Sequence, residues 1–329
     1  MASLDSLDKI KLGPHKKSPK MKDRFIRAYR AFNAPIPKME TRNQYESWWS
    51  KPGPELNDSW IEKFCAFHQI PPLQFISCYK NRETIQKSKH LKTVFFSGEH
   101  LQDRFKEYDD HMIGQVDYSI GFDKLEHPNY LRFPLWLLYF TAPNTKNPGK
   151  DFVAAFSRKW TSDRPFFCSQ ISSHDERGNG RGLRTSCSSA LAEIGEVLNV
   201  GRLLNNSKIL QEKYHNNPHY FLRDCRFNIC LENSYAPGYV TEKIFRPLLC
   251  GAIPIYWGDP NPESNIINPN SFLRYDSENP ESLIKAVGDL EENEGLRSDF
   301  IHQNKIQEGA ADWINEIHHT LADELRNLQ

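Results

Sequence analysis

The sequence predicts a protein of the α/β class, built from two successive domains that face each other across a cleft. Short apolar runs rich in aromatic and β-branched residues recur along the chain, and helical or turn segments separate them. This alternation is typical of a mostly parallel sheet covered by helices. This alternation is interrupted once, between about residues 141 and 165. A length of 329 residues suits two domains of about 150 each.

The first domain is expected to cover residues 1–163. A helical pattern at WIEKFCAFH places Trp60, Phe64 and Phe67 on one face. Three apolar runs predict short buried strands: LQFISCY (73–79), KTVFFSGE (92–99) and VDYSIGF (116–122). The segments TAPNTKNPGK and SRKWTSDRP are dense in Pro, Asn, Thr and Lys, which predicts the boundary between the domains.

The second domain is expected to cover residues 164–329. Strands are predicted at PFFCSQISS (165–173), RFNICLEN (226–233) and AIPIYWG (252–258). Helices are predicted at 183–198, 206–216, 239–251 and 282–290, followed by a long C-terminal helix. Gly251 is the expected C-terminal stop of its helix, because glycine adopts the left-handed conformation there without strain.

Charge and hydropathy exclude several classes of protein. Lys plus Arg and Asp plus Glu both total 42, so nucleic acid is not an expected partner. No apolar run approaches the roughly 20 residues of a membrane span, and the N-terminus lacks the apolar core of a secretory signal. We therefore expect a cytoplasmic protein if these residues are the whole chain; an excised catalytic part of an anchored protein is the alternative. The basic segment 9–30 predicts a solvated arm, with peripheral contact to an anionic membrane left open.

The sequence holds no recognisable metal or cofactor motif. Its seven cysteines are odd in number and form neither a C-x-x-C pair nor a zinc-finger pattern, which favours reduced cysteines packed as small apolar residues. Asp-x-Asp, the P-loop and the dinucleotide Gly-x-Gly-x-x-Gly are also absent. We expect no required cofactor, so a phosphate ligand would be neutralised by side-chain cations. Stimulation by Mn²⁺ is left open.

The polar segment ENSYAPGYVTEK (232–243) is the strongest candidate for a binding site. Pro237 and Gly238 break the chain before the predicted helix, whose first N–H groups and Lys243 would suit a phosphate. Glu242 would suit sugar or ribose hydroxyls, while Glu232 and Asn233 end the preceding strand. Ordinary helix capping explains the same residues equally well.

Two arginines and one glutamate complete the set of candidates. Arg184, in GRGLRTS, and Arg202, in NVGRLLNN, have the fork that binds a diphosphate bidentately. Glu99 follows a buried strand after a Ser-Gly turn, where α/β sheets hold reactive groups, and would suit a general base. Surface positions for the arginines and a capping role for Glu99 are the alternatives.

Together these motifs resemble the α-1,3/4-fucosyltransferases. The segment FNICLENSYAPGYVTEKIFRPLLCGAIPIYWG (227–258) is similar to the family signature, and KTVFFSGEH, VDYSIGFD and YLRFPL continue the resemblance in the first domain. The bacterial, non-anchored members are the most similar. The resemblance implies a GT-B fold of two facing Rossmann-like domains, the N-terminal one binding the acceptor and the C-terminal one binding GDP-β-L-fucose. It also implies inverting transfer to the 3-hydroxyl or 4-hydroxyl of GlcNAc or glucose in lactosamine-type or Lewis-type glycans, such as those of lipopolysaccharide.

Site residues follow from the resemblance position by position. Glu99 matches the family's general base, and Arg202 and Lys243 match the cations on the donor diphosphate. The residues around nucleotide and fucose correspond to Asn233, Tyr239 and Glu242, and less securely to Arg184. The loop HDERGNGRG (174–182) replaces a more compact family segment, so donor contacts there are in doubt.

Two other functions remain open from the sequence. One is a GT-B glycosyltransferase with a different nucleotide-sugar donor. The other is a carbohydrate- or nucleotide-binding module without turnover. Neither the acceptor, an oligosaccharide or a glycolipid, nor the oligomeric state can be read from the sequence.

Overall fold

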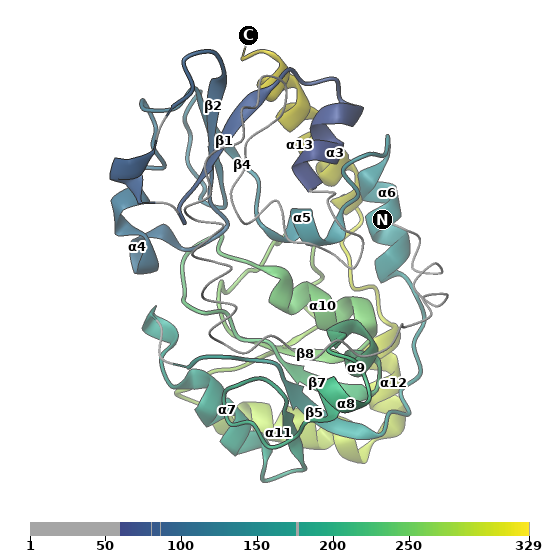
Figure 1. The fold of residues 1–329 in the computed structure, drawn as a ribbon. Coiled ribbons are helices and arrows are strands. Elements are labelled where there is room, and N and C mark those ends of the chain that lie inside the picture. The colour runs from purple at the N-terminus through teal and green to yellow at the C-terminus, as the bar shows by residue number, and fades with distance from the viewer. Residues whose placement is uncertain (1–59, 80, 86, 176–177, 329) are drawn as a thin grey trace.

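The computed structural model describes residues 60–79, 81–85, 87–175 and 178–328, and the structural statements below concern this part of the chain. Two parallel β-sheets, each with its own helices, lie one above the other in Figure 1. Helix α10 lies between them (Figure 1).

The N-terminal sheet has the strand order β1-β2-β3-β4, and all its strands are parallel. Its strands are β1 (Leu73–Ser77), β2 (Lys92–Phe96), β3 (Tyr118–Gly121) and β4 (Tyr130–Arg132). Its helices are α3 (Trp60–Phe67), α4 (Leu101–Arg104), α5 (Trp136–Phe140) and α6 (Pro148–Phe156), with 3-10 turns η1 (Arg82–Thr84) and η2 (Lys106–Tyr108). Because the strands are parallel, their carboxyl ends share one edge, and Glu99 follows one of them.

The C-terminal sheet has the order β6-β5-β7-β8-β9, again parallel throughout. Its strands are β5 (Phe166–Gln170), β6 (Val197–Asn199), β7 (Cys225–Ile229), β8 (Ile253–Tyr256) and β9 (Leu273–Arg274). Its helices are η3 (Gly178–Gly180), α7 (Leu183–Leu191), α8 (Ile209–Glu212), α9 (Pro218–Arg223), α10 (Glu242–Cys250), α11 (Pro280–Glu292) and α12 (Glu294–His302). The loop between β7 and α10 carries most of the predicted donor-binding residues.

The final helix, α13 (Ala310–Arg326), returns to the N-terminal domain. In Figure 1 it lies beside α3, at the level of the N-terminal sheet. Ile314 and Leu321 are fully buried in the same apolar cluster as Phe64. Crossing back in this way makes the end of the chain part of the N-terminal core.

The predicted helix at 183–198 is wrong in its second half. Helix α7 ends at Leu191, and residues 197–199 form strand β6 beside β5. Gly195 separates the two, and a Cβ there would come within 2.8 Å of the ring of Phe167. Val197 and Leu198 then bury as strand residues, which helical periodicity alone did not reveal.

Other boundaries shift by a few residues. Helix α10 begins at Glu242 instead of 239, and Gly251 ends it with a φ of 73°, which confirms the predicted stop. Helix α6 occupies part of the predicted linker, since Phe152 and Phe156 bury against the N-terminal core. Each sheet lies on its own side of residues 163–164, and that precise boundary stays a prediction.

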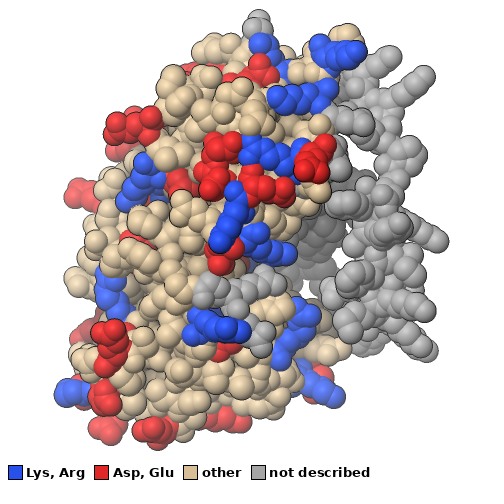
Figure 2. All heavy atoms as spheres, turned by 90° about the vertical axis from the view of Figure 1, so that its left-hand side faces the viewer, with Lys and Arg blue, Asp and Glu red and all other residues tan. Residues whose placement is uncertain are grey.

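Composition agrees with the structure in two further respects. All seven cysteines are free and buried, as expected of reduced apolar residues. Basic and acidic side chains mix on the face shown in Figure 2, in keeping with a formal charge of zero. No helix in the described residues is long and apolar enough to cross a membrane. The basic segment 9–30 lies outside the described residues.

Candidate active site

Glu99 lies at the carboxyl edge of the N-terminal sheet, three residues beyond β2. Its backbone N–H donates to the Ser97 hydroxyl at 3.2 Å, which forms the tight turn after the strand. A Cβ on Gly98 would come within 2.8 Å of Leu135 Cδ1, so the turn packs closely on that side chain. The Tyr79 hydroxyl donates to Glu99 Oε1 at 2.5 Å, which orients the carboxylate.

The loop that follows β7 contacts Glu99 from the other domain. The Tyr239 hydroxyl, on a side chain only 2% exposed, lies 3.5 Å from Glu99 Oε2. Next to it, His100 Nδ1 lies 2.8 Å from the Ser234 hydroxyl. Burial lowers the pKa of His100, so the ring is neutral near pH 7. The predicted base and the predicted donor loop therefore meet between the domains.

Lys243 forms a buried ion pair with Glu232. The Lys243 ammonium donates to Glu232 Oε2 at 3.1 Å and to the Thr241 hydroxyl at 3.0 Å. Glu232 also accepts from the Thr241 backbone N–H at 2.8 Å. Burial lowers the pKa of Lys243, but Glu232 and Glu242 raise it to a net value above the ordinary one, which keeps the ammonium charged.

Burial also raises the pKa of Glu232, while Lys243 and Thr241 favour its ionised form. The helix begins three residues later than expected, and the N–H of its N-cap residue Thr241 donates to Glu232.

Arg184 holds the strand end that carries Asn233. Its guanidinium donates to Asn233 Oδ1 and the Leu231 carbonyl at 2.8 Å each, and to the His174 carbonyl at 2.7 Å. The exposed Arg202 reaches the same network, since its Nη2 lies 3.1 Å from His174 Nε2. The two predicted arginines are thus joined through one histidine.

A second contact between the domains fixes the peptide before Tyr239. Arg132, at the end of β4, pairs with Glu263 at 2.7 Å and donates to the Gly238 carbonyl at 3.3 Å. The Gly238 N–H donates to Asp259 Oδ2 at 2.6 Å, and Gly238 has a φ of 82°. A small hollow of about 80 Å³ lies here, lined by residues of both domains.

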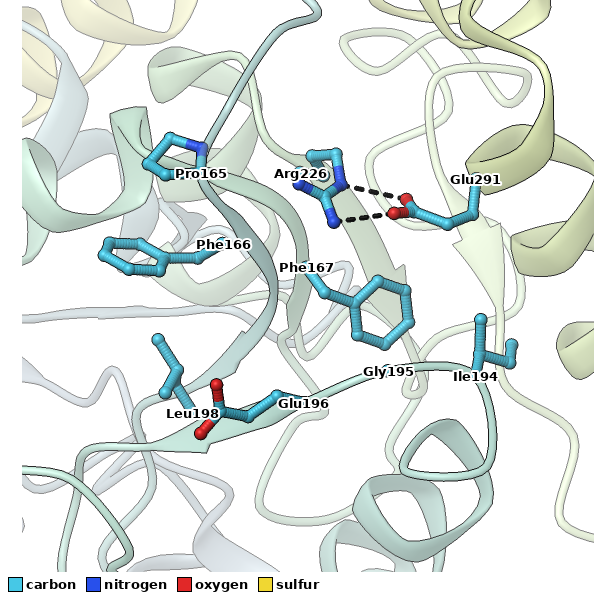
Figure 3. A pocket seen from close by; sticks show the side chains of 9 residues that line it. All are labelled: Pro165, Phe166, Phe167, Ile194, Gly195, Glu196, Leu198, Arg226 and Glu291. Carbon is cyan, nitrogen blue, oxygen red and sulfur yellow. Dashed lines mark hydrogen bonds and ion pairs between the residues drawn. The ribbon is translucent and has the colours of Figure 1, made fainter.

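A larger hollow of about 260 Å³ lies elsewhere, at the amino ends of β5 and β7 (Figure 3). Among its lining residues, the Arg226 guanidinium and the Glu291 carboxylate form a direct ion pair at 2.6 Å (Figure 3). Phe166 and Phe167 supply its apolar wall. Ligands of α/β sheets bind at the opposite, carboxyl edge of the strands, and Arg226, the one cation among the described residues that line this hollow, is already paired with Glu291. It is not part of the candidate site.

The structure brings most of the predicted residues into contacts that sequence reasoning did not foresee. Glu99 meets Tyr239, Arg184 meets Asn233, and Glu242 lies 3.9 Å from Arg246 one turn along α10. Sequence reasoning missed four polar residues that join these groups: Tyr79, His100, His174 and Ser234. Tyr79 was detectable in principle, because it follows β1 at the sheet edge where Glu99 follows β2.

Two family descriptions match the chain. Residues 58–139 match "Alpha-(1,3)-fucosyltransferase FucT N-terminal domain", and residues 163–315 match "Glycosyltransferase family 10 (fucosyltransferase) C-term". Alpha-(1,3)-fucosyltransferase FucT of Helicobacter pylori is 27% identical over 271 residues, which are 73% of this chain and 54% of that protein. GDP-fucose protein O-fucosyltransferase 3 of Xenopus laevis is 32% identical over 114 residues, 32% of this chain and 24% of that protein. The chain thus spans about half or less of these curated relatives.

Solved structures agree on the fold. The crystal structure of an α1,3-fucosyltransferase superimposes with a TM-score of 0.54 at 22% identity, covering 88% of this chain and 92% of that one. Its complex with GDP-fucose gives a TM-score of 0.50 at 23% identity, covering 78% of each chain. The predicted GT-B arrangement is confirmed. With both of its domains matched, this chain belongs to glycosyltransferase family 10, the fucosyltransferases.

Proposed function

We propose that the chain is an inverting α-1,3-fucosyltransferase that uses GDP-β-L-fucose as donor. One observation carries the proposal: the Glu99 carboxylate of one domain lies 3.5 Å from Tyr239 in the donor loop of the other. A general base and a nucleotide-sugar site must be adjacent for a hydroxyl to attack the bound sugar. Family membership supports the fucosyl donor.

In the proposed reaction, the acceptor oxygen attacks fucose C1 from the face opposite the diphosphate. The C1–O bond to the β-phosphate breaks, GDP leaves, and the β-linkage of the donor becomes an α-linkage in the product. Glu99 accepts the hydroxyl proton, an assistance worth about 10²–10⁴-fold. Lys243 and Arg202 stabilise the charge that grows on the leaving diphosphate, with Asn233, Tyr239, Glu242 and Arg184 around the nucleotide and sugar.

We also propose that these cations suffice without a required metal ion. The carboxylate partner of Lys243 keeps its ammonium charged, and the arginine fork of Arg202 suits a diphosphate. Chelation with EDTA should then leave transfer largely intact, and added Mn²⁺ should at most stimulate it. Complete loss on chelation, with recovery on adding Mn²⁺, would contradict this part of the proposal.

For the acceptor, we propose GlcNAc or glucose in a lactosamine-type glycan, on an oligosaccharide or glycolipid. The relative named as a protein O-fucosyltransferase makes a polypeptide hydroxyl the second candidate. Incubation with GDP-fucose and type 1, type 2, lactose and peptide acceptors, followed by linkage determination, separates these. Transfer from another nucleotide sugar only, or binding without transfer, would support the rival functions.

We propose a cytoplasmic location, with peripheral membrane contact through the basic segment 9–30 as a variant of it. Positive charge near an anionic surface contributes about 1 kcal/mol per residue. Co-sedimentation with vesicles containing phosphatidylserine, at low and high salt, tests the contact. If the protein shows no salt-sensitive binding to the vesicles, the basic segment is a solvated arm without membrane contact.

A further inference from the structure

The two oxygens of Glu99 have unequal partners. Oε1 accepts from the Tyr79 hydroxyl at 2.5 Å, within the range of a strong bond between a hydroxyl and a carboxylate. Oε2 faces the Tyr239 hydroxyl at 3.5 Å, the outer limit of a hydrogen bond. One oxygen is therefore held firmly, and the other, on the side of the donor loop, is held weakly.

Tyr79 is itself fixed in place. It follows β1 by two residues, and its backbone N–H donates to the Ser77 hydroxyl at 3.4 Å. Its half-buried ring packs edge-on against Phe105, with centroids 5.1 Å apart. Burial raises the pKa of Tyr79 well above its ordinary value, and the Glu99 carboxylate raises it further. The phenol therefore stays protonated at any working pH and donates a hydrogen bond to Glu99.

We propose that Tyr79 is the positioning residue of the reaction. It holds Oε1 of Glu99, so that Oε2 is the atom that accepts the proton of the acceptor hydroxyl. The inference rests on the proposed function. The acceptor hydroxyl displaces only the weak Tyr239 contact, while the strong bond keeps the carboxylate aimed at the donor side.

The titratable groups around the Glu99 carboxylate and the Tyr79 hydroxyl are Cys78, His100 and Arg104 on the same domain, and Tyr239 with Glu232 and Glu242 near it on the other. A Tyr79→Phe substitution leaves all of these in place, so a difference from the parent reports the lost hydroxyl.

The test measures kcat and the KM for GDP-fucose of Tyr79→Phe. Losing a hydrogen bond to a charged group should lower kcat by roughly 10–100-fold. The KM for GDP-fucose should stay within about twofold, since Tyr79 belongs to the N-terminal domain and the donor is expected on the C-terminal one.

Tyr214→Phe is the matched control. Tyr214 also donates to a carboxylate, that of Asp224, but far along the chain in the C-terminal domain. Both variants should melt near the parent temperature, and Tyr214→Phe should keep the parent kcat and KM. A Tyr79→Phe enzyme with unchanged kcat overturns the inference.

A fall in kcat accompanied by a comparable rise in the KM for GDP-fucose, or by a lower melting temperature, also overturns it, because a purely structural role would produce that result. Failure of the proposed function gives a different pattern. In that case the parent protein itself transfers no fucose to any acceptor, or Glu99→Gln transfers it at the parent rate.

Discussion

At the scale of single residues, the Glu232–Lys243 pair holds a cation largely out of water at the start of α10. The Glu232 side chain is fully buried and that of Lys243 is 22% exposed. Burying a charge is costly unless a partner and hydrogen bonds compensate it, and Thr241 supplies the remaining bonds. Two of the three ammonium donors are engaged within the described residues, and the proposed function assigns the third to a phosphate oxygen.

Replacing Lys243 with Ala should therefore have two separable effects. The loss of a charged donor should weaken GDP binding at least about tenfold, measured by calorimetry. The carboxylate left unpaired in the interior should also lower the free energy of unfolding by roughly 3–5 kcal/mol. Denaturant titration measures this second effect.

The double variant Lys243→Ala/Glu232→Gln is the control, because it removes the orphaned charge as well. It should recover much of the lost stability and none of the GDP affinity. Recovery of both would mean that Lys243 serves the fold alone and does not bind the donor.

At the scale of elements, α10 is fixed at both ends by residues outside it. Thr241 and Glu232 hold its start, and Arg164 holds its end through the Cys250 carbonyl at 3.1 Å. Gly251 follows with a φ of 73°, and a Cβ there would lie 2.3 Å from the ring of Trp160 and 2.5 Å from Arg164 Nη2. Positioning of the donor loop therefore depends on both ends of one helix.

A Gly251→Ala substitution should destabilise the protein by roughly 2–4 kcal/mol. About 1 kcal/mol comes from the left-handed backbone and the remainder from overpacking against Trp160. Gly288→Ala is the control, because it lies inside α11 with open space around it and should stabilise slightly. Equal melting temperatures for the two variants would contradict the assigned packing at Gly251.

The sequence patterns predicted where these helices and strands lie along the chain better than they predicted which side chains contact one another. Gly251 was predictable because the stop signal is local, and the strand before Glu99 because its apolar run is continuous. Strand β6 was not, since Val197 and Leu198 continue an apolar pattern that a helix also satisfies. The roles of the site residues came from the resemblance to a family signature. The pairing of Glu232 with Lys243 depends on the path of the chain between them, which the sequence pattern does not encode.

At the scale of the whole molecule, the C-terminal helix joins the last residues to the N-terminal core. His318 on α13 is 2% exposed and lies 2.9 Å from the Thr141 hydroxyl. Its ring packs against Trp60 at 5.5 Å and Phe64 at 5.8 Å. Burial lowers the pKa of His318 to about 3, with smaller contributions from His68 and His319.

The stability of the fold should consequently fall in acid. The native ring stays neutral, while the same histidine in the unfolded chain binds a proton below about pH 6.5. The free energy of unfolding should therefore fall by roughly 1.4 kcal/mol for each pH unit between pH 6.5 and pH 3. A His318→Gln variant does not titrate, and its melting temperature should depend less on pH in that window. His319→Gln, at the exposed neighbouring position, should keep the parent slope; identical slopes for all three proteins would contradict the assignment.

Both domains are needed for the proposed reaction, because the base and the cations lie on opposite sides of the space between them. The most direct test is the turnover of GDP-β-L-fucose with a lactosamine acceptor by the parent protein and Glu99→Gln, with the product anomer read by NMR. We expect α-linked fucose from the parent, and a rate about 10²–10⁴-fold lower from Glu99→Gln with unchanged GDP affinity. Near-parent turnover by a folded Glu99→Gln protein, or a β-linked product, would contradict the assignment of Glu99 as the base of an inverting transfer.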